Sequence, residues 1–484
     1  MRLNNSTAIP AAVSQPRYAR QHHGAGIVHL GLGAFHRGHQ AWYTEAVLNR
    51  FGGNWRIIGV SLRSESVYQQ LMPQDCLYTL EVRHGQQRQR QLIGALAEVL
   101  AAPAQPDKVI AALAQRATHV VTLTITEKGY CLSASSGELD SALPAVQHDL
   151  NNPAAPQTAL GFLCAGLAAR RAQDLPGLTI ISCDNIANNG DKLRRAVLTF
   201  SQLIDPTLAS WIDRHCRFPA TMVDRIVPAS TEADLDGLAA AVGYRDQAAV
   251  FTEAFVQWVI EDHFAGPVPP WNKVGAAFVA DVAPFETMKL RLLNASHSAI
   301  AYFGMLTGAQ TVDEVIAQPV MRRAISRLMA EAEPTLDLPP DFDVAAYRQQ
   351  LLTRFDNSAL GHRCQQIAMD GSQKLPNRIV PILQWQLNND GAVTMTCAVL
   401  AAWCRYLLGL DERARPYTID DPAADALAAR LRESGGEPVK MTAIFLEHGG
   451  ILPESIAADP RVARGIQHWL TDFGERGIIA ALDN

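Results

Sequence analysis

The sequence lacks most of the features that are typical of secreted proteins, of membrane-spanning proteins and of small proteins stabilised by a bound metal. Its eight cysteines are scattered and none forms a CxxC pair, which argues against a disulfide framework or a zinc knuckle and favours reduced thiols. No run approaches the roughly 18 apolar residues of a membrane span. The N-terminal stretch is polar and broken by Pro10 and Pro16, so it lacks the apolar core of a signal peptide. We therefore expect a cytoplasmic protein without a membrane anchor.

The chain also lacks a strong excess of charge of either sign. Its 484 residues carry a formal net charge of −6, and 48% of them are hydrophobic against 19% charged, the balance of a globular protein with a sizeable core. Such a balance gives no electrostatic reason to bind nucleic acid or an anionic membrane, although one local cationic pocket would suffice for a small anion. We expect a small-molecule partner and, since no interface stripe stands out, a monomer or weak homo-oligomer.

Strand-like and helix-like segments alternate through the first half of the chain. A polar turn around Gly85 joins two of the strand-like segments. This alternation predicts a mainly parallel sheet with helices on both faces. The expected strands are 26–30, 56–62, 78–82, 91–99, 118–125 and 178–182, and the expected helices are 41–49, 107–115 and 160–173.

The pattern changes near Pro284, where β-like runs become rare and amphipathic helical runs dominate. We therefore expect an α/β domain over residues 1–284 and a mainly α-helical domain over residues 285–484. The expected helices of the second domain include 288–306, 320–332, 392–408 and 461–473.

Two closely spaced glycines, Gly31 and Gly33, follow the first expected strand and precede a helix. Such glycines let the backbone turn tightly and approach a pyrophosphate, which the N–H groups of the helix N-terminus then bind. A bare GxG also fits a simple strand–turn–helix corner, but its place on the first crossover favours a dinucleotide site. The third glycine of the full GxGxxG motif is absent, because His36 occupies its position.

Glu65 follows the second expected strand, where dinucleotide sites carry an acid that holds the ribose hydroxyls. A solvated loop carboxylate fits the same position equally well. Arg63 and Ser66 beside it leave room for the 2′-phosphate of NADP. We expect NAD as the cofactor, with NADP not excluded.

Lys289, Asn294 and His297 fall within an arc of about 140° on one helix, at about 100° per residue. A lysine whose pKa is lowered by burial can take the proton of an alcohol that is being oxidised. An amide and an imidazole can then hydrogen-bond the oxygen as it changes between alkoxide and carbonyl. Spacing alone fits a surface lysine and a core histidine better, so it does not decide the matter.

Several motifs in a fixed order carry a family resemblance that covers Ile27 to Phe473. The sequence resembles the mannitol dehydrogenase family of long-chain polyol-specific dehydrogenases, which includes mannitol 2-dehydrogenases, arabinitol and sorbitol dehydrogenases, and fructuronate reductases. The motifs are 31–39, 74–79, 124–130, 182–186, 221–228 and the Lys289, Asn294, His297 spacing.

The resemblance implies a Rossmann-type N-terminal domain, a helical C-terminal domain, a cleft between them and a metal-independent reaction. It implies that Lys289 is the general base or acid, while Asn294 and His297 bind and polarise the reacting oxygen. The residues implied at the substrate are Asn185, Asp224, Lys374 and Arg363, and those implied at the cofactor are Gly31, Gly33, Ala34, Phe35, Glu65, Thr126 and Lys128.

One departure from the family pattern bears on the substrate. Mannitol-oxidising members carry an arginine eight residues before the position of Lys374, and this chain has Gln366 there. The run from Gln366 to Pro376 looks more like the hexuronate-reducing branch, although Arg363 lies one helical turn earlier. A carboxylate substrate needs a cation such as Lys374, Arg363 or Arg378, each of which also fits a surface charge. We expect a sugar acid of the D-mannonate/D-fructuronate type, with mannitol or arabinitol and their ketoses as the alternative.

Two other readings of the sequence remain. The His36-x-x-His39 pair suggests a zinc alcohol dehydrogenase, but without a third placed ligand we expect no metal. A non-enzymatic NAD-binding sensor is compatible with the fold, because a fold by itself does not fix a function. The joint presence of Lys289, Asn294 and His297 favours an enzyme over a sensor.

Overall fold

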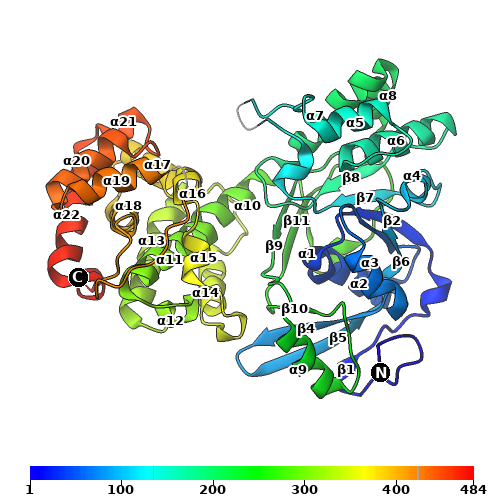
Figure 1. Ribbon diagram of the computed structural model, residues 1–484, viewed down its shortest axis with the longest axis horizontal. Helices are drawn as coiled ribbons and strands as arrows, with labels where there is room; N and C mark the ends of the chain where they lie inside the picture. The colour runs from blue at the N-terminus through cyan, green and yellow to red at the C-terminus, as the bar shows by residue number, and fades with distance from the viewer. Residues whose placement is uncertain (134–135, 422–423, 484) are drawn as a thin grey trace. The chain divides into compact units, whose positions relative to one another are not determined.

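The computed structural model describes residues 1–133, 136–421 and 424–483. The chain divides into two compact units, Met1–Ala283 and Pro284–Asn484 (Figure 1). Among the helices in these described ranges, none combines the length and apolar character that crossing a bilayer requires.

A five-stranded parallel sheet forms the centre of the first unit, in the order β6-β3-β2-β7-β8. Its strands are nearly all buried, as expected for runs such as Val-Val-Thr-Leu that are covered on both faces. The prediction of a mainly parallel sheet is confirmed. The strands are β2 (Ala25–Leu30), β3 (Arg56–Ser61), β6 (Leu96–Ala101), β7 (Val120–Leu123) and β8 (Thr179–Ser182).

Alternate residues of these strands enter two separate cores, one on each face of the sheet. Val28 and Val60 pack with apolar residues of α4, α6 and α7, whereas Ile27 and Ile57 pack with those of α2. The helices named are α2 (Gln40–Phe51), α4 (Pro106–Leu113), α6 (Ala159–Ala172) and α7 (Asn189–Ile204); the unit also contains α1 (Ala34–Gly38), α3 (Ser66–Leu71), α5 (Pro144–Asn151), α8 (Pro206–His215) and α9 (Glu232–Val242).

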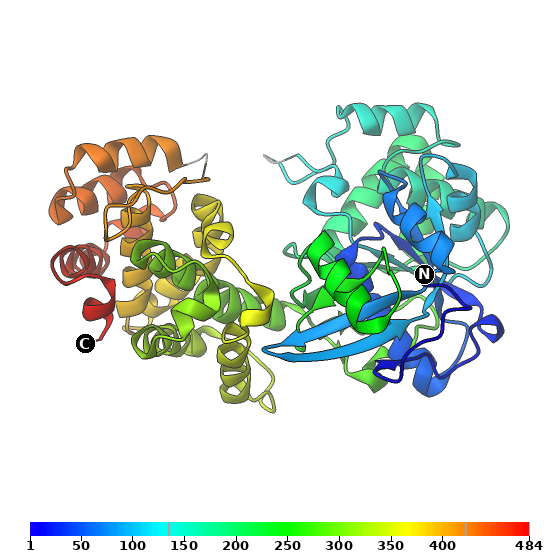
Figure 2. The ribbon, with the colours of Figure 1, turned by 60° about the horizontal axis from the view of Figure 1, so that its bottom comes forward.

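Two smaller sheets complete the first unit. One has the order β1-β5-β4-β10, in which β4 (Tyr78–His84) and β5 (Gln87–Ile93) form a hairpin that turns at Gly85 as expected; Figure 2 shows it as a pair of long blue strands. The expected single strand 91–99 is wrong, because it joins the end of β5 to the start of β6. The chain leaves one sheet for the other at Gly94 and Ala95. The remaining strands are β1 (Val13–Ser14), β10 (Val250–Thr252), β9 (Thr221–Asp224), β11 (Gln257–Glu261) and β12 (Ala277–Val279), the last three forming the third sheet.

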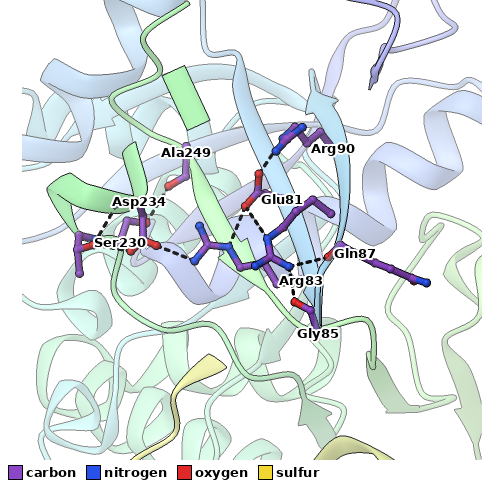
Figure 3. A network of polar contacts seen from close by, with 10 residues as sticks. Glu81, Arg83, Gly85, Gln87, Arg90, Ser230, Asp234 and Ala249 are labelled. Carbon is purple, nitrogen blue, oxygen red and sulfur yellow. Dashed lines mark hydrogen bonds and ion pairs between the residues drawn. The ribbon is translucent and has the colours of Figure 1, made fainter. Parts of the chain in front are cut away.

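A charged network ties the hairpin to α9 (Figure 3). Glu81 accepts hydrogen bonds from Arg83 at 2.8 Å and from Arg90 at 2.7 Å, and Arg83 also reaches Asp234 at 2.6 Å. The guanidinium of Arg83 lies 4.0 Å from the ring centre of Phe251. The two carboxylates therefore neutralise the charge of Arg83, and the ring of Phe251 packs against the flat face of its guanidinium.

The second unit is helical, and its described residues contain no strand beyond isolated bridges. Its central helix α11 (Ala295–Thr307) is buried along most of its length. The helices expected near 320–332, 392–408 and 461–473 are confirmed as α13, α18 and α22. The unit contains α10 (Ala283–Met288), α12 (Val312–Ile316), α13 (Pro319–Ala332), α14 (Val344–Phe355), α15 (Cys364–Ala368), α16 (Gly371–Arg378), α17 (Val380–Asn388), α18 (Thr394–Tyr406), α19 (Asp425–Glu433), α20 (Pro438–His448), α21 (Glu454–Ala457), α22 (Pro460–Arg476) and α23 (Ile478–Leu482).

Candidate active site

A pocket of about 420 Å³ lies where β2, β3 and β7 end at their carboxyl edge. Its walls come from the ends of these strands and the segments that follow: 31–33 after β2, 61–64 at the end of β3, and 124–126, Lys128 and Gly129 after β7. The strand order reverses at β2, because β3 continues the sheet to one side and β7 to the other. Such a switch point is where open α/β sheets bind their ligands.

Gly31 and Gly33 shape the floor of this pocket in different ways. Gly31 has a φ of +96°, and a Cβ there would lie 2.2 Å from the carbonyl oxygen of Thr124. At Gly33 a Cβ would meet nothing nearer than the carbonyl oxygen of Gly31, at 3.8 Å. Gly31 is therefore required by the fold itself, whereas a side chain at Gly33 would fill open space beside the pocket.

A buried histidine, His29, supports the glycine turn, and its role was not predicted from the sequence. The ring of His29 contacts the hydroxyl oxygens of Thr122 at 2.8 Å and Thr124 at 2.9 Å, and Thr124 donates to the carbonyl oxygen of Gly31 at 2.8 Å. Burial lowers the pKa of His29 to about 3, so the ring is neutral at physiological pH. The ring of His36 stacks on it at a centroid distance of 3.4 Å.

The role of Asp184 was also not predicted from the sequence. This residue holds the wall of the pocket that follows β7. Its carboxylate accepts the backbone N–H groups of Ile125 at 3.0 Å and Thr126 at 2.9 Å, and the hydroxyl of Tyr130 at 2.7 Å. Thr126 has a φ of 64°, an uncommon value for a residue with a branched side chain. Asp184 thus holds in place the strained loop that carries Thr126 and Lys128. Burial raises the pKa of this carboxyl.

Four of the seven predicted cofactor residues line the pocket: Gly31, Gly33, Thr126 and Lys128. The other three lie elsewhere in the described structure. Ala34 and Phe35 begin α1, with the Phe35 ring stacked on His39 at 5.1 Å. Glu65 is exposed at the start of α3, and its neighbours Arg63 and Ser64 line the pocket instead.

The predicted substrate residues of the first unit follow two further strands. Asn185 is exposed and comes three residues after the end of β8, and Asp224 is the buried last residue of β9. Asn189 links the two strands, since its side-chain amide donates to the carbonyl oxygen of Thr221 at 2.9 Å and to that of Asp184 at 3.1 Å.

In the second unit, a π turn interrupts the helix expected over 288–306. Residues Lys289–Asn294 form this turn, and the N–H of Ala295 donates to the carbonyl oxygen five residues back, at Leu290. The wider turn brings residues five apart towards one side of the helix, so the expected 100° per residue is wrong across it. Lys289 and Asn294 are both buried, with 7% and 9% of their surface exposed. π turns of this kind are frequent at functional sites.

His297 lies one turn further along, in α11. Its ring contacts those of Phe355 and His362 at centroid distances of 5.0 Å and 5.3 Å. Burial lowers the pKa of His297 well below its ordinary value, and the charges of His362, Arg354, Arg378 and Lys289 lower it further. The side chain is therefore a neutral imidazole close to several cationic groups.

Arg378 of α16 packs directly against the π turn. Its Nη1 donates to the carbonyl oxygen of Asn294 at 3.3 Å and to the hydroxyl of Ser298 at 3.1 Å. Lys374 lies one turn earlier, and its ammonium donates to the carbonyl oxygens of Ile367 at 3.3 Å and Met369 at 2.5 Å. Burial and the neighbouring charge of Arg378 lower the pKa of Lys374.

The other two positions that bear on the substrate lie on α15. Arg363 is exposed as the residue that caps this helix, next to His362, and Gln366 is exposed within it. Within the described residues, no three His, Cys, Asp or Glu side chains gather as metal ligands. The eight cysteines are buried free thiols.

Comparisons with known proteins cover both units. Residues 25–273 match the family model of the mannitol dehydrogenase Rossmann domain, and residues 281–458 match that of the mannitol dehydrogenase C-terminal domain. The chain is 40% identical over 480 residues to D-mannonate oxidoreductase of Escherichia coli (strain K12), covering 97% of this chain and 98% of that protein. It is 38% identical over 466 residues to mannitol 2-dehydrogenase of Aspergillus fumigatus, covering 94% and 92%.

Two solved structures resemble the whole chain. A ternary complex of Pseudomonas fluorescens mannitol 2-dehydrogenase with NAD and D-mannitol matches with a TM-score of 0.82 and 36% identity, over 100% of this chain and 99% of that one. A D-sorbitol dehydrogenase in substrate-free form matches with a TM-score of 0.94 and 30% identity, over the full length of both. The resemblance carried by the sequence motifs is thereby confirmed, and the chain belongs to the mannitol dehydrogenase family.

Proposed function

We propose that this protein is an NAD-dependent oxidoreductase that interconverts a secondary alcohol of a sugar acid with its ketone, using Lys289 as acid and base. Family membership makes the chain an oxidoreductase acting on CH–OH groups. The observation that carries the proposed chemistry is the π turn, which gathers Lys289 and Asn294 next to a neutral His297.

The pocket of the first unit fits a dinucleotide. Its position at the switch point, the open space that a side chain at Gly33 would fill, and the exposed Lys128 on its wall suit a bound pyrophosphate. The segment after β3, with Arg63 and Ser64 at the pocket, would meet the adenosine ribose. We propose NAD because the mannitol 2-dehydrogenase structure similar to this chain holds NAD. When bound, this group supplies the acceptor or donor of the hydride.

Lys289 would hold and move the proton. In the oxidation direction the neutral amine accepts the proton of the substrate hydroxyl group. At the same time, hydride leaves the carbon atom that bears this hydroxyl group. In the reduction direction the ammonium gives that proton back to the carbonyl oxygen. The amine is 7% exposed and lies close enough to His297 for its charge to act on that ring, so the two groups belong to one buried cluster.

Asn294 and His297 would position the reacting oxygen. The neutral imidazole and the side-chain amide are both able to donate a hydrogen bond to an oxygen that gains negative charge. Because the pKa of His297 is so low, the imidazole does not compete with Lys289 for the proton. Lysine is thereby the group that titrates during the reaction, and histidine is the group that orients.

The cationic side chains near the π turn favour a substrate that carries a carboxylate. Of the three cations that the sequence suggested, Arg378 contacts the π turn itself, and only its Nη1 is bonded within the described residues. Its Nε and Nη2 are left to form the paired hydrogen bonds that a carboxylate accepts. The absence of a charge at Gln366 and the 40% identity to D-mannonate oxidoreductase support a sugar acid of the mannonate/fructuronate type.

A neutral polyol is the second candidate, supported by the similarity over full length to the mannitol 2-dehydrogenase complex. The two candidates separate in one assay. Oxidation of NADH by the purified protein is followed with fructuronate, tagaturonate, fructose and xylulose, with and without a chelator. A kcat/KM for a uronate at least about 10-fold above that for fructose, equal to about 1.4 kcal/mol, supports the sugar acid. Faster turnover of fructose would establish the polyol, and turnover abolished by the chelator would overturn the lysine mechanism.

A further inference from the structure

A pocket of about 690 Å³ lies at the other end of the parallel sheet of the first unit. β3 begins at Arg56, which lines this pocket, and ends at Ser61, which lines the cofactor pocket. With a rise of about 3.3 Å per residue, the two ends are about 16 Å apart. Its walls are formed by part of the segment between Asn4 and Gln21, in which Arg17 does not take part, and by Arg56, Met72, Asp75, Cys76, Leu77, Leu92 and Ala97. This pocket is thus separate from the cofactor pocket.

Two arginines lie side by side in its wall. The Nη2 groups of Arg20 and Arg56 both donate to the carbonyl oxygen of Leu96, at 3.2 Å and 2.6 Å, and Nη1 of Arg56 donates to the carbonyl oxygen of Arg20 at 3.2 Å. Within the described residues neither arginine has a carboxylate within 4.0 Å of its guanidinium. Burial and the charge of Arg20 lower the pKa of Arg56. The two like charges are therefore held together without an ion pair of their own, although Asp75 lines the same pocket and Glu45 acts on Arg56 from a greater distance.

Several N–H groups of this pair remain available. Arg20 uses four of its five, since it also donates to the carbonyl oxygens of Gly94 and Asp75 and to the side chain of Asn5. Arg56 uses two, and its buried Nε has no partner. By contrast, the hairpin arginine Arg83 is neutralised by two carboxylates. A bound anion would neutralise the pair and accept hydrogen bonds from the Nη groups that still have an N–H without a partner, whereas the buried Nε of Arg56 is out of its reach.

The rest of the lining suits an organic molecule rather than a bare ion. Asn4, Gln15 and Gln21 line the pocket together with the apolar residues Leu77 and Leu92. The volume falls in the range of small-molecule sites, about 300–1,000 Å³. We propose that this pocket binds a small organic anion, a carboxylate or a phosphate ester, whose charge pairs with Arg20 and Arg56.

The pocket is connected to a buried carboxyl group of α2. Tyr18, on the pocket wall, donates to Glu45 at 2.9 Å, and Glu45 also accepts the N–H of Gly94 at 2.8 Å and the side-chain amide of Asn49 at 3.1 Å. Burial raises the pKa of Glu45 to about 7, while the charge of Arg20 lowers it. An anion on the arginines would offset that charge and raise the pKa of Glu45 further. By linkage, the anion then binds more tightly as the pH falls through about 7.

Titration calorimetry on the full chain tests the proposal with two probes, citrate and glycerol 3-phosphate, with glycerol as the uncharged control. We expect a Kd of about 1 mM or lower for at least one anion, and the probe that binds identifies carboxylate or phosphate chemistry. Saturating NADH should leave this binding in place, because the pocket is separate from the cofactor pocket. Absence of heat with both anions would overturn the proposal.

Matched variants assign the binding to the pocket. Arg56→Gln removes one charge and two backbone hydrogen bonds, and Arg17→Gln removes the charge of an exposed neighbour that does not line the pocket. We expect Arg56→Gln to weaken the anion about 10-fold or more, and Arg17→Gln to leave its Kd within about twofold. Arg56→Lys keeps the charge and serves if the glutamine variant does not fold. Equal affinity in a folded Arg56 variant and the unmodified protein would place the anion elsewhere.

Discussion

Gly33→Ala separates the cofactor site from the stability of the fold. Gly33 has φ −103° and ψ −175°, which alanine adopts without strain, and the new methyl group would meet no atom nearer than 3.8 Å. Such a change stabilises a chain by about 0.4–1 kcal/mol through the unfolded state. The methyl group would occupy the space proposed for the pyrophosphate, where overpacking costs about 1–3 kcal/mol. We therefore expect the Kd for NADH to rise about 5- to 150-fold while thermal stability is kept.

Two further glycines make the comparison decisive. Gly31→Ala would put a side chain on a left-handed backbone, and its Cβ would lie 2.2 Å from the carbonyl oxygen of Thr124. About 2–5 kcal/mol of the free energy of unfolding should therefore be lost together with NADH binding. At Gly237, inside α9, a methyl group meets no atom within 4 Å, so Gly237→Ala should stabilise slightly and leave the Kd unchanged. Melting curves without ligand and NADH fluorescence titrations measure both quantities. An unchanged Kd in folded Gly33→Ala would refute the proposed cradle.

Three other predictions follow from the two sites. Lys289→Ala should lower turnover by about 10²–10⁴ with the Kd for NADH unchanged, and loss of NADH binding in the same variant would mean that Lys289 has another role. Arg378→Gln should lower kcat/KM for fructuronate at least about 10-fold more than for fructose; an equal loss for both would assign Arg378 to the π turn rather than to the carboxylate. Because the pKa of buried His29 is about 3, below its value of about 6.5 in an unfolded chain, the unfolded state takes up its proton first. Stability should accordingly fall as the pH drops from about 6.5 towards 3, by up to about 5 kcal/mol, and His29→Gln should flatten this dependence in melting curves; an unchanged slope would show that other groups dominate.

The local pattern of apolar and polar residues was sufficient to predict the parallel sheet, because the strands of this sheet are continuous apolar runs bounded by polar turns. It failed at 91–99, where β-like residues continue across the change of sheet at Gly94, since a run of strand formers does not reveal which partner each part pairs with. The α-helical spacing put the three candidate catalytic residues on one helical segment, and they lie on the π turn and the first turn of α11. It did not reveal the π turn, because an angle of 100° per residue assumes the α-helical bond pattern from the start.

The supporting residues of the site were out of reach for a different reason. His29 reads as one position of a buried strand, and Asp184 as the neighbour of a predicted substrate residue. Their roles depend on contacts with Thr124 and with the N–H groups of Ile125 and Thr126, which are 58 to 95 positions away in the chain. The glycine doublet and the acidic position after β3 were found by motif, but the motif did not indicate that Glu65 would lie outside the pocket.

The π turn holds one residue more than an α-helical turn at the same place would need, because its bond spans five residues instead of four. In an uninterrupted α-helix, deleting a residue would rotate everything before it by about 100° and shift it by about 1.5 Å. Deleting Leu290 or Leu292 would instead let the π turn close into an ordinary α-helix, because the deletion removes only the extra residue. The segments on either side would keep their relative orientation. The π turn is thus a point at which this helix can lose a residue without turning Lys289 away from His297.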